Sequence, residues 1–368
     1  MATNRRHGSK KMSRKKARRR RRRIIFGLEI VVILLLVVAL YVVYRLDLAD
    51  TGNKKSVVNA KVNDEVQAQI DDKENDNWKM DGYTNVALFG VDSRDTNLGK
   101  GARTDTIMVA SLNNSTGEVK LCSIFRDTYL NIGNDTYNKA NAAYHIGGPE
   151  QAIQMLNTNL DMDIDEYVTV GFKALVDTID DLGGIQVDIT EEEIHFLNDY
   201  QIGTAEAIGI KQGDIVNVTA AGPQTLNGLQ ATSYCRIRYT KGDDFKRAER
   251  QRTVLTQVAE KAMAADINTL DKLIDDIFPL CSTSFTKAEL VEYAARAATF
   301  KLGDKDGFPF DRITGNMGKA GSSVVADGFA QNVIKFHSFL FGDSEYTPSQ
   351  AVKDIDGKIQ SDRQRYGL

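Results

Sequence analysis

Arginine and aspartate side chains gather at the ends of segments that the sequence predicts to be strands. They fall in several short stretches that are far apart in the chain, with a glutamine and a lysine among them. Loops that a rigid sheet holds at strand ends are the usual place for ligand-binding groups. The candidate residues are Asp92, Arg103, Asp105, Arg126, Lys139, Arg236, Arg238, Asp244, Arg247 and Gln251.

Such a set favours the binding of a phosphate-bearing ligand. Arginines that converge repel one another unless an anion lies between them, and their forked guanidinium groups suit phosphate oxygens. Two carboxylates beside them, Asp92 and Asp105, suit Mg²⁺ or Mn²⁺, because magnesium takes few protein carboxylates and shares its shell with phosphates and water. This combination fits phosphoryl transfer, which depends on positioning and charge neutralisation. The alternative is ordinary surface ion pairs worth under about 1 kcal/mol each, and the residues alone leave it open.

The predicted elements would bring these groups together. Arg236 and Arg238 lie two apart on a predicted strand at residues 232–238, so we expect both to point to one face. Arg247 and Gln251 lie four apart on a predicted helix and should also share a face. Other short apolar runs predict strands at 86–91, 107–112, 119–124, 167–170 and 185–189. Helical spacing predicts helices at 148–160, 172–181, 246–264, 268–276, 286–299 and 327–340, and a short extended piece is expected at 310–325.

This mixture of strands and helices has no strict alternation and no internal repeat. We therefore predict one α/β domain at residues 83–345, with a mixed central β-sheet flanked by helices. The terminal residues 346–368 are expected to form a tail or amphipathic helix.

The beginning of the chain predicts a membrane anchor. Residues 24–44 are apolar except for Glu29, and at about 1.5 Å per residue they span the roughly 30 Å hydrocarbon core. A cleaved signal peptide is the alternative, but Arg45 and Asp47 follow where small residues would be needed. Residues 1–23 contain thirteen Lys and Arg residues and no acid. They predict a cytoplasmic N-terminus and a domain outside the cell membrane.

Four other features of the sequence are the basic tail, residues 45–82, the cysteines and the histidines. The basic tail could bind nucleic acid, but contact with anionic membrane lipid is favoured and no nucleic-acid partner is expected. Residues 45–82 are polar and acidic and predict a stalk between membrane and domain. Cys122, Cys235 and Cys281 could include one disulfide or be three buried apolar residues. The four histidines lack metal-ligand spacing.

Several stretches of the sequence resemble the LytR–CpsA–Psr family of cell-envelope proteins. They follow one another in the order of the family over residues 85–257. The matching stretches are NVALFGVDSRD, GARTDTIMVASLN, VKLCSIFRDTYLNI, NKANAAYHIGGPEQAI, DEYVTVGFKALVDTIDDLGGIQVDI and LNGLQATSYCRIRYTKGDDFKRAERQ. The order of several independent motifs makes the resemblance specific.

The resemblance implies an extracytoplasmic phosphotransferase of a Gram-positive-type envelope. Such enzymes move teichoic acid or capsular polysaccharide from an undecaprenyl-pyrophosphate carrier to peptidoglycan. It implies that Asp92 and Asp105 hold the metal and that Asp92 is favoured to help deprotonate the acceptor. The residues implied to bind the pyrophosphate are Arg126, Arg236, Arg238, Arg247 and Gln251, with Arg103 and Lys139 assisting. Asp244 is implied to orient the arginines. Asp92, Asp105 and Arg126 form the implied catalytic group.

Two further points follow from the resemblance. The family lines a hydrophobic tunnel for the polyprenyl chain, for which residues 168–182 and 254–262 are candidates, although ordinary core packing is favoured for each residue alone. Phe125 stands where the family usually has a proline, so the turn that carries Arg126 lacks that rigidity. Two alternatives remain open: a polyprenyl-pyrophosphate phosphatase that uses water as acceptor, and a membrane-bound transcriptional attenuator without enzymatic activity.

Overall fold

The computed structural model describes residues 58, 60–72, 79–92, 98–238, 240, 242–265, 269, 273, 276–285, 289, 293 and 299–368. All of them belong to a unit that comprises residues 52–368. The predicted basic tail, the predicted membrane anchor and much of the predicted stalk lie outside the described residues. Among the helices that are described, none is both long enough and apolar enough to cross a membrane.

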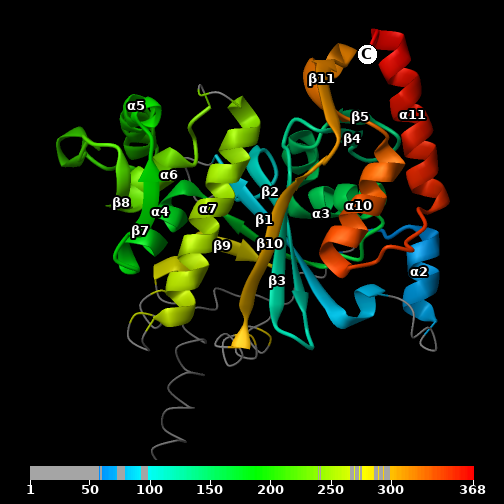
Figure 1. The fold of residues 1–368 in the computed structure, drawn as a ribbon, viewed down its shortest axis with the longest axis horizontal. Helices are drawn as coiled ribbons and strands as arrows, with labels where there is room; N and C mark the ends of the chain where they lie inside the picture. Colours follow the sequence, from blue (N-terminus) through cyan, green and yellow to red (C-terminus); the bar gives the residue numbers. More distant parts are fainter. Residues whose placement is uncertain are drawn as a thin grey trace, which may run out of the picture. The chain divides into compact units, whose positions relative to one another are not determined.

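A six-stranded mixed sheet lies at the centre of the described unit (Figure 1). Its strand order is β10-β3-β2-β1-β6-β9. The pairs β1·β2, β2·β3 and β6·β9 are antiparallel, whereas β1·β6 and β3·β10 are parallel. The strands are β1 (Tyr83–Val91), β2 (Thr104–Asn113), β3 (Glu118–Ile124), β6 (Glu166–Val170), β9 (Cys281–Thr283) and β10 (Lys301–Phe308). The prediction of a mixed α/β fold with a central sheet is confirmed.

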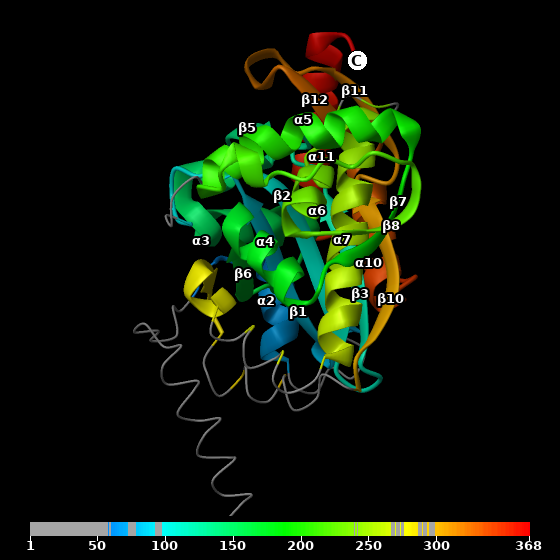
Figure 2. The same ribbon diagram turned by 90° about the vertical axis from the view of Figure 1, so that its left-hand side faces the viewer.

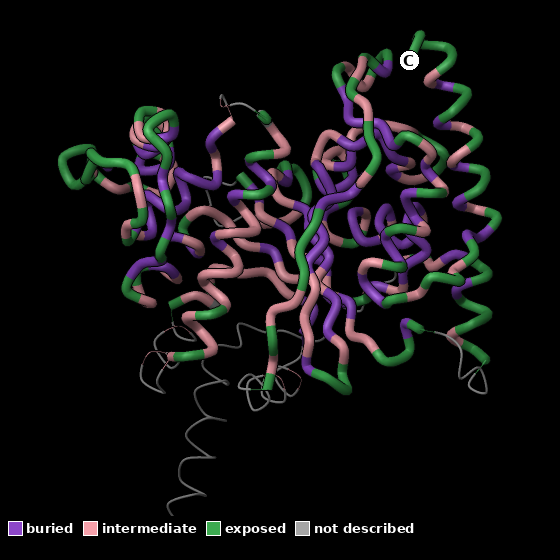
Figure 3. Tube along the Cα trace, viewed as in Figure 1, coloured by how far each residue is buried: buried purple, intermediate pink, exposed green. Residues whose placement is uncertain are grey.

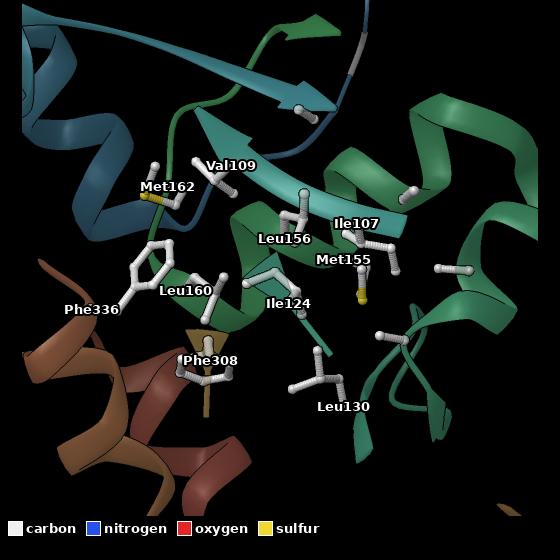
Figure 4. Close-up of a cluster of buried hydrophobic side chains, with 14 of the residues drawn as sticks. Ile107, Val109, Ile124, Leu130, Met155, Leu156, Leu160, Met162, Phe308 and Phe336 are labelled. Atoms are coloured by element: carbon white, nitrogen blue, oxygen red, sulfur yellow. The ribbon is translucent and has the colours of Figure 1, made fainter. Parts of the chain in front are cut away.

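One face of the sheet packs on the main hydrophobic core. Alternate residues of β1, namely Ala87, Phe89 and Val91, are buried in it, as the two-residue period of a strand requires. Figure 4 shows how side chains of the sheet, of α3 and of the chain's C-terminal part meet there. The helices that contribute to this core are α2 (Asp64–Asp71), α3 (Asn141–Leu160), α10 (Phe329–Phe341) and α11 (Gln350–Tyr366). The central strands and α3 are largely buried, while α11 keeps an exposed side (Figure 3).

The second face of the sheet is covered by a different set of helices. These elements lie together in the view of Figure 2. They comprise α4 (Phe172–Asp181), α5 (Glu191–Ile208), α6 (Gly228–Tyr234), α7 (Asp243–Ala264) and the hairpin of β7 (Ile185–Ile189) and β8 (Gly222–Leu226). A smaller core that includes Ile179, Leu197 and Val254 holds them together.

Small elements complete the described fold. Two further hairpins join β4 (Tyr129–Asn131) to β5 (Tyr137–Lys139) and β11 (Arg312–Asn316) to β12 (Ser322–Ala326). Short 3-10 helices are η1 (Lys79–Gly82), η2 (Gln212–Asp214), η3 (Phe278–Leu280) and η5 (Gly318–Ala320).

Most predicted elements are confirmed in type and place. The predicted strands at 86–91, 107–112, 119–124, 167–170 and 185–189 are β1, β2, β3, β6 and β7. The predicted helices at 148–160, 172–181, 246–264 and 327–340 correspond to the second part of α3, α4, α7 and α10. The extended piece at 310–325 is the β11·β12 hairpin. Most residues of the predicted helices at 268–276 and 286–299 lie outside the described residues.

The predicted strand at residues 232–238 is wrong. This stretch is the end of helix α6 followed by a turn. Asn227 caps the helix: its side chain accepts from the backbone N of Gln230 at 2.9 Å, and the Gln230 side chain accepts from the Asn227 backbone N at 3.0 Å. Gly228 allows the helix to approach α4, because a Cβ at this position would lie 2.1 Å from the backbone oxygen of Val176. Capping and close packing thus outweigh the β-propensity of the apolar residues that follow.

The three cysteines are free thiols in this structure. Cys122 and Cys235 are buried, and Cys281 is half-buried. Burial raises the pKa of the Cys235 thiol to about 12 and that of Cys281 to about 11. Of the two possibilities that the sequence left open, the structure supports apolar packing rather than a disulfide.

Candidate functional site

A cavity of about 190 Å³ lies between the second face of the sheet and helices α4, α6 and α7. Leu88 and Gly90 reach it from β1 because they alternate with the residues that point into the main core. Apolar side chains of the other walls are Met108, Val168, Val170, Leu175, Val254 and Leu255. Several come from the two stretches, 168–182 and 254–262, that the sequence suggested as tunnel walls.

Part of the cavity wall is polar. Asp105 of β2, Arg236 after α6, and Arg247 and Gln251 of α7 line it there. Three of these residues, Asp105, Arg247 and Gln251, also line a small adjoining cavity. Gln251 spans the junction: its side-chain amide donates to the backbone oxygens of Asp105 at 3.4 Å and of Cys235 at 3.5 Å. An apolar cavity therefore meets a charged site at a shared wall.

The charged site is organised around the carboxylate of Asp244. Its Oδ1 lies 3.2 Å from Arg238 Nε and 3.3 Å from an Arg247 guanidinium nitrogen, and its Oδ2 lies 3.7 Å from Arg126 Nε. Arg126 also donates a hydrogen bond to the carboxylate of Asp105. One carboxylate thus orients three arginines that come from separate parts of the chain.

The arginines in this cluster retain donors that the protein does not satisfy. The Nε atoms of Arg126 and Arg247 are buried, and neither has a hydrogen-bond partner among the described residues. A buried, unsatisfied donor is costly and calls for an explanation such as a ligand. Within the described part of the chain, Arg126 Nε has only the carboxylate oxygens of Asp244 and Asp127 nearby, at 3.7 and 3.8 Å. Because both arginines line a cavity at this wall, an anion is the ligand that their guanidinium groups would accept.

The electrostatics of the two arginines differ. Burial opposes the charged form of Arg126, but the carboxylates of Asp105, Asp244 and Asp127 together raise its pKa above the ordinary value. Burial lowers the pKa of Arg247, and the charge of Arg126 lowers it further, although Asp244 acts in the opposite direction. A bound anion would therefore stabilise the charged form of Arg247 more than that of Arg126.

Asp127 and Lys139 extend the cluster on the side of β5. Lys139 Nζ lies 3.3 Å from Asp127 Oδ1, and Arg126 Nε lies 3.8 Å from Asp127 Oδ2. The carboxyl groups of Asp127 and Asp244 also share a hydrogen bond. Burial and this hydrogen bond raise the pKa of Asp127, whereas the hydrogen bond from Asp127 and the charge of Arg247 lower the pKa of Asp244 despite its burial. The pKa of Asp127 therefore lies above its ordinary value and that of Asp244 below it.

Arg236 and Arg238 do not share a face, contrary to the expectation from the predicted strand. Arg238 turns to Asp244, whereas Arg236 donates to Thr204 Oγ1 at 2.8 Å. The Arg236 guanidinium lies 4.6 Å from the ring centre of Phe172 and 5.4 Å from that of Tyr200. It reaches the cavity wall rather than the cluster around Asp244.

Asp92 and Arg103 lie beside Asp105 at the end of β1. The backbone N of Asp92 donates to the backbone oxygen of Arg103 at 3.2 Å, and both side chains are exposed. Asp105 is the extra residue of a bulge between β1 and β2, which bends the strand and re-aims the side chain. No ion pair within the described residues joins Arg103 to the arginine cluster.

These carboxylates fit a hard divalent cation that is only partly held by protein. No group of three or more His, Cys, Asp or Glu side chains in the described part of the chain could hold a metal by itself. The carboxylates of Asp92 and Asp105 carry oxygen atoms of the kind that Mg²⁺ prefers when phosphates and water complete its shell.

Phe125, which precedes Arg126, is fixed by packing. Its ring meets Phe245 edge to face, with ring centres 4.8 Å apart. The Arg312 guanidinium lies over both rings, 4.8 Å from the centre of Phe125 and 4.3 Å from that of Phe245. The backbone of Phe125 also donates to Phe308 O at 3.1 Å. This packing supplies the rigidity at the Arg126 turn that the sequence suggested was lost.

Sequence reasoning missed some residues that build the site. Asp127 directly follows Arg126, so its position beside a candidate arginine was an available signal. Tyr200 and Thr204 lie on α5, an element that was not predicted. Their contacts with Arg236 join segments more than thirty positions apart, and the local sequence pattern does not predict such contacts.

Comparison with known proteins identifies relatives of this chain. The LytR_cpsA_psr family model matches residues 43–328. The chain is 31% identical over 195 residues to the Bacillus subtilis polyisoprenyl-teichoic acid–peptidoglycan teichoic acid transferase TagV, covering 52% of this chain and 46% of the relative. It is 34% identical over 208 residues to Bacillus subtilis TagU, a transferase of the same description, covering 55% and 59%.

The matches therefore span about half the length of these curated relatives. The crystal structure of Bacillus subtilis TagV superimposes with a TM-score of 0.56 at 26% identity, covering 72% of this chain and 98% of that one. The extent of the family match, together with this likeness in fold, settles the relationship: the chain belongs to the LytR_cpsA_psr family.

Proposed function

We propose that this protein transfers a glycopolymer, such as teichoic acid or a capsular polysaccharide, from an undecaprenyl-pyrophosphate carrier to peptidoglycan. The observation that carries the proposal is the arginine cluster with unsatisfied buried donors at the polar wall of an apolar cavity. An amphiphile with an apolar chain and a pyrophosphate head matches both parts at once. The relatives TagV and TagU bear names that describe such a transfer.

The protein's contribution to this reaction is positioning and charge stabilisation. The apolar cavity takes the isoprene units next to the pyrophosphate, which keeps water away from that side. Arg126, Arg238 and Arg247 then bind the phosphate oxygens, and Arg236 reaches them from the cavity wall. Because these arginines are already oriented by Asp244, little reorganisation is needed when negative charge develops.

In the transfer step, an acceptor hydroxyl oxygen of peptidoglycan forms a bond to the phosphorus that carries the glycopolymer. The bond from that phosphorus to the bridging oxygen breaks, and undecaprenyl phosphate leaves. The proton of the hydroxyl passes to a base, for which Asp92 is the exposed carboxylate beside the site. Asp92 and Asp105 would hold Mg²⁺ or Mn²⁺, which when bound would neutralise part of the phosphate charge.

We further propose that the segment 24–44 anchors the protein in the cell membrane with the basic tail inside and the described domain outside. This topology would place the cavity within reach of a lipid-linked substrate, and residues 45–82 would set that reach. The apolar length of 24–44 and the thirteen basic residues before it support the proposal.

The test uses the full-length protein in lipid nanodiscs with a lipid-linked, labelled glycopolymer, Mg²⁺ and peptidoglycan fragments. We expect label to move to the peptidoglycan and undecaprenyl phosphate to appear in equal amount. Release of free phosphorylated glycopolymer alone would show a phosphatase instead. Absence of any turnover, with transcript changes on deletion of the basic tail, would support the attenuator. The Arg126→Ala variant is the control for turnover at this site.

A further inference from the structure

Helix α5 presents one face to the turn between α6 and α7, which carries two arginines of the site. Tyr200 and Thr204 on this face contact the Arg236 side chain. Glu193, seven residues before Tyr200 and therefore on the same side of the helix, contacts Arg250. The arginines of the turn are thus held, directly or through another side chain, by a helix that lines neither the apolar cavity nor its small neighbour.

Arg250 is the link between α5 and the turn. Its Nε donates to Glu193 Oε1 at 2.8 Å, and its two terminal nitrogens donate to Ile237 O at 3.1 Å and to Thr240 Oγ1 at 2.7 Å. The side chains of Arg250 and Glu193 are only 5% and 9% exposed. Every nitrogen of the guanidinium is therefore engaged, and two of the three bonds end on the turn that carries Arg238.

Glu193 uses both carboxylate oxygens. Oε1 accepts from Arg250, while Oε2 accepts from the backbone N of Thr190 at 2.9 Å and from its hydroxyl at 3.0 Å. The second set of bonds forms the capping box at the beginning of α5. One carboxylate consequently joins the start of α5 to Arg250 and, through it, to the turn.

The energetics of this buried pair point to a role beyond stability. Removing two charges from water is expensive, and apolar residues of similar volume in place of a buried ion pair are often neutral or stabilising. Packing alone could therefore be achieved without Arg250 and Glu193. What an apolar pair cannot provide is a set of directional bonds to the carbonyl of Ile237 and the hydroxyl of Thr240.

We propose that Glu193 and Arg250 are positioning residues that fix the turn at residues 235–238 so that Arg236 and Arg238 can bind the pyrophosphate. The inference rests on the proposed function and adds to it two residues that do not touch the ligand. A displacement of binding groups by about 1 Å can reduce a rate a hundredfold, so a loosened turn should be visible in binding without a loss of fold.

The test compares two variants of the full-length protein, with geranylgeranyl pyrophosphate as the probe. In the double variant Glu193→Met and Arg250→Met, the buried charges are replaced by apolar side chains. We expect the variant to fold, because the gain from removing the buried charges opposes the loss of the capping box of α5. Its Kd for the probe should rise at least about tenfold. Arg363→Met on α11, which removes an ion pair with Asp327 at 3.0 Å, is the matched control and should bind like the wild type.

The second variant, Glu193→Gln, keeps the result interpretable if the double variant does not fold. A glutamine has one carbonyl oxygen, so it can cap α5 or accept from Arg250 but cannot do both. We expect intermediate weakening of probe binding. Wild-type affinity in the folded double variant, or in Glu193→Gln if the double variant is unfolded, overturns the inference. Wild-type affinity in Arg247→Met would instead overturn the proposed pyrophosphate site itself.

Discussion

Replacing Asp244 with asparagine tests whether this carboxylate holds the arginine cluster together. The variant keeps the shape of the side chain but removes the charge that faces Arg126, Arg238 and Arg247. Arg238 is 38% exposed, so its share is under about 1 kcal/mol. Arg247 is 5% exposed, and breaking a buried pair costs about 3–5 kcal/mol.

Two features reduce the expected loss below that range. Asp244 is itself 17% exposed, and an amide oxygen can still accept one of the hydrogen bonds. We therefore expect Asp244→Asn to lower the free energy of unfolding by about 2–3 kcal/mol. For a unit of this size, that loss corresponds to a fall in melting temperature of about 3–5 °C.

The assay is thermal unfolding with and without inorganic pyrophosphate. An anion that binds the folded state stabilises it by mass action, and in the variant it also supplies the missing negative charge. The deficit of Asp244→Asn should therefore shrink as pyrophosphate is added. Asp177→Asn, which removes an exposed ion pair with Lys173 at 2.7 Å, is the matched control and should change stability by less than about 0.5 kcal/mol.

The dependence on pH gives an independent check of the same reasoning. The folded protein lowers the pKa of Asp244 below its ordinary value of 3.8, so the stability that its charge contributes is present above pH 3.8 and is lost as the pH falls through the lowered pKa. The gap between wild type and Asp244→Asn should close in that range. A variant that melts like the wild type at neutral pH, or a deficit that pyrophosphate leaves unchanged, would refute the role assigned to this carboxylate.

Four further outcomes follow from the geometry. Asp127→Asn should gain stability relative to the wild type as the pH rises above 3.8, because the folded protein raises the pKa of Asp127 and its stabilising proton is lost over that range. Melting curves at several pH values measure this. A difference in melting temperature that does not change with pH would contradict it. Arg126→Ala and Asp92→Ala should each abolish transfer and leave the circular dichroism spectrum unchanged, since Asp92 is exposed and Arg126 lies outside both hydrophobic cores. Turnover at the wild-type rate in both variants would exclude the assigned site. Gly228→Ala should lower the free energy of unfolding by about 1–3 kcal/mol, seen as a lower urea midpoint, because its new methyl group would overlap a backbone oxygen of α4. Val170→Phe should fill part of the apolar cavity and weaken binding of geranylgeranyl pyrophosphate, while titration with inorganic pyrophosphate should give the wild-type Kd.

The strands and long helices could be predicted because their signals are local. In β1, alternate residues are buried in the core, and the apolar run at 86–91 is sufficient to predict this strand. The helix at 148–160 was placed correctly because Gly148 has a φ of 70°, which ends the first part of α3, and Pro149 is well suited to begin the next. In these cases local preference and tertiary packing agree.

The arrangement of the site was less accessible because it depends on contacts between distant segments. The stretch at 232–238 has the composition of a strand, but the Asn227–Gln230 capping box and the close approach at Gly228 make it a helix and a turn. As a consequence, Arg236 and Arg238 diverge. The residue types of the cluster follow from the sequence, whereas Asp244 as the shared partner of three arginines follows only from the fold.

Helix α7 contributes residues both to the charged site and to the apolar cavity. Asp244, Arg247, Gln251 and Leu255 are spaced by three or four residues and therefore lie along one side of the helix. Along this side the chemistry changes from carboxylate to guanidinium, then to amide, then to aliphatic side chain. At 1.5 Å per residue, Arg247 and Leu255 are separated by about 12 Å along the axis. Because the second cavity shares Arg247 and Gln251 with the first, the boundary between polar and apolar parts of a bound amphiphile is set near Gln251. An amphiphilic ligand whose charged group lay elsewhere along its length would leave either the arginine donors or the apolar cavity walls without a partner.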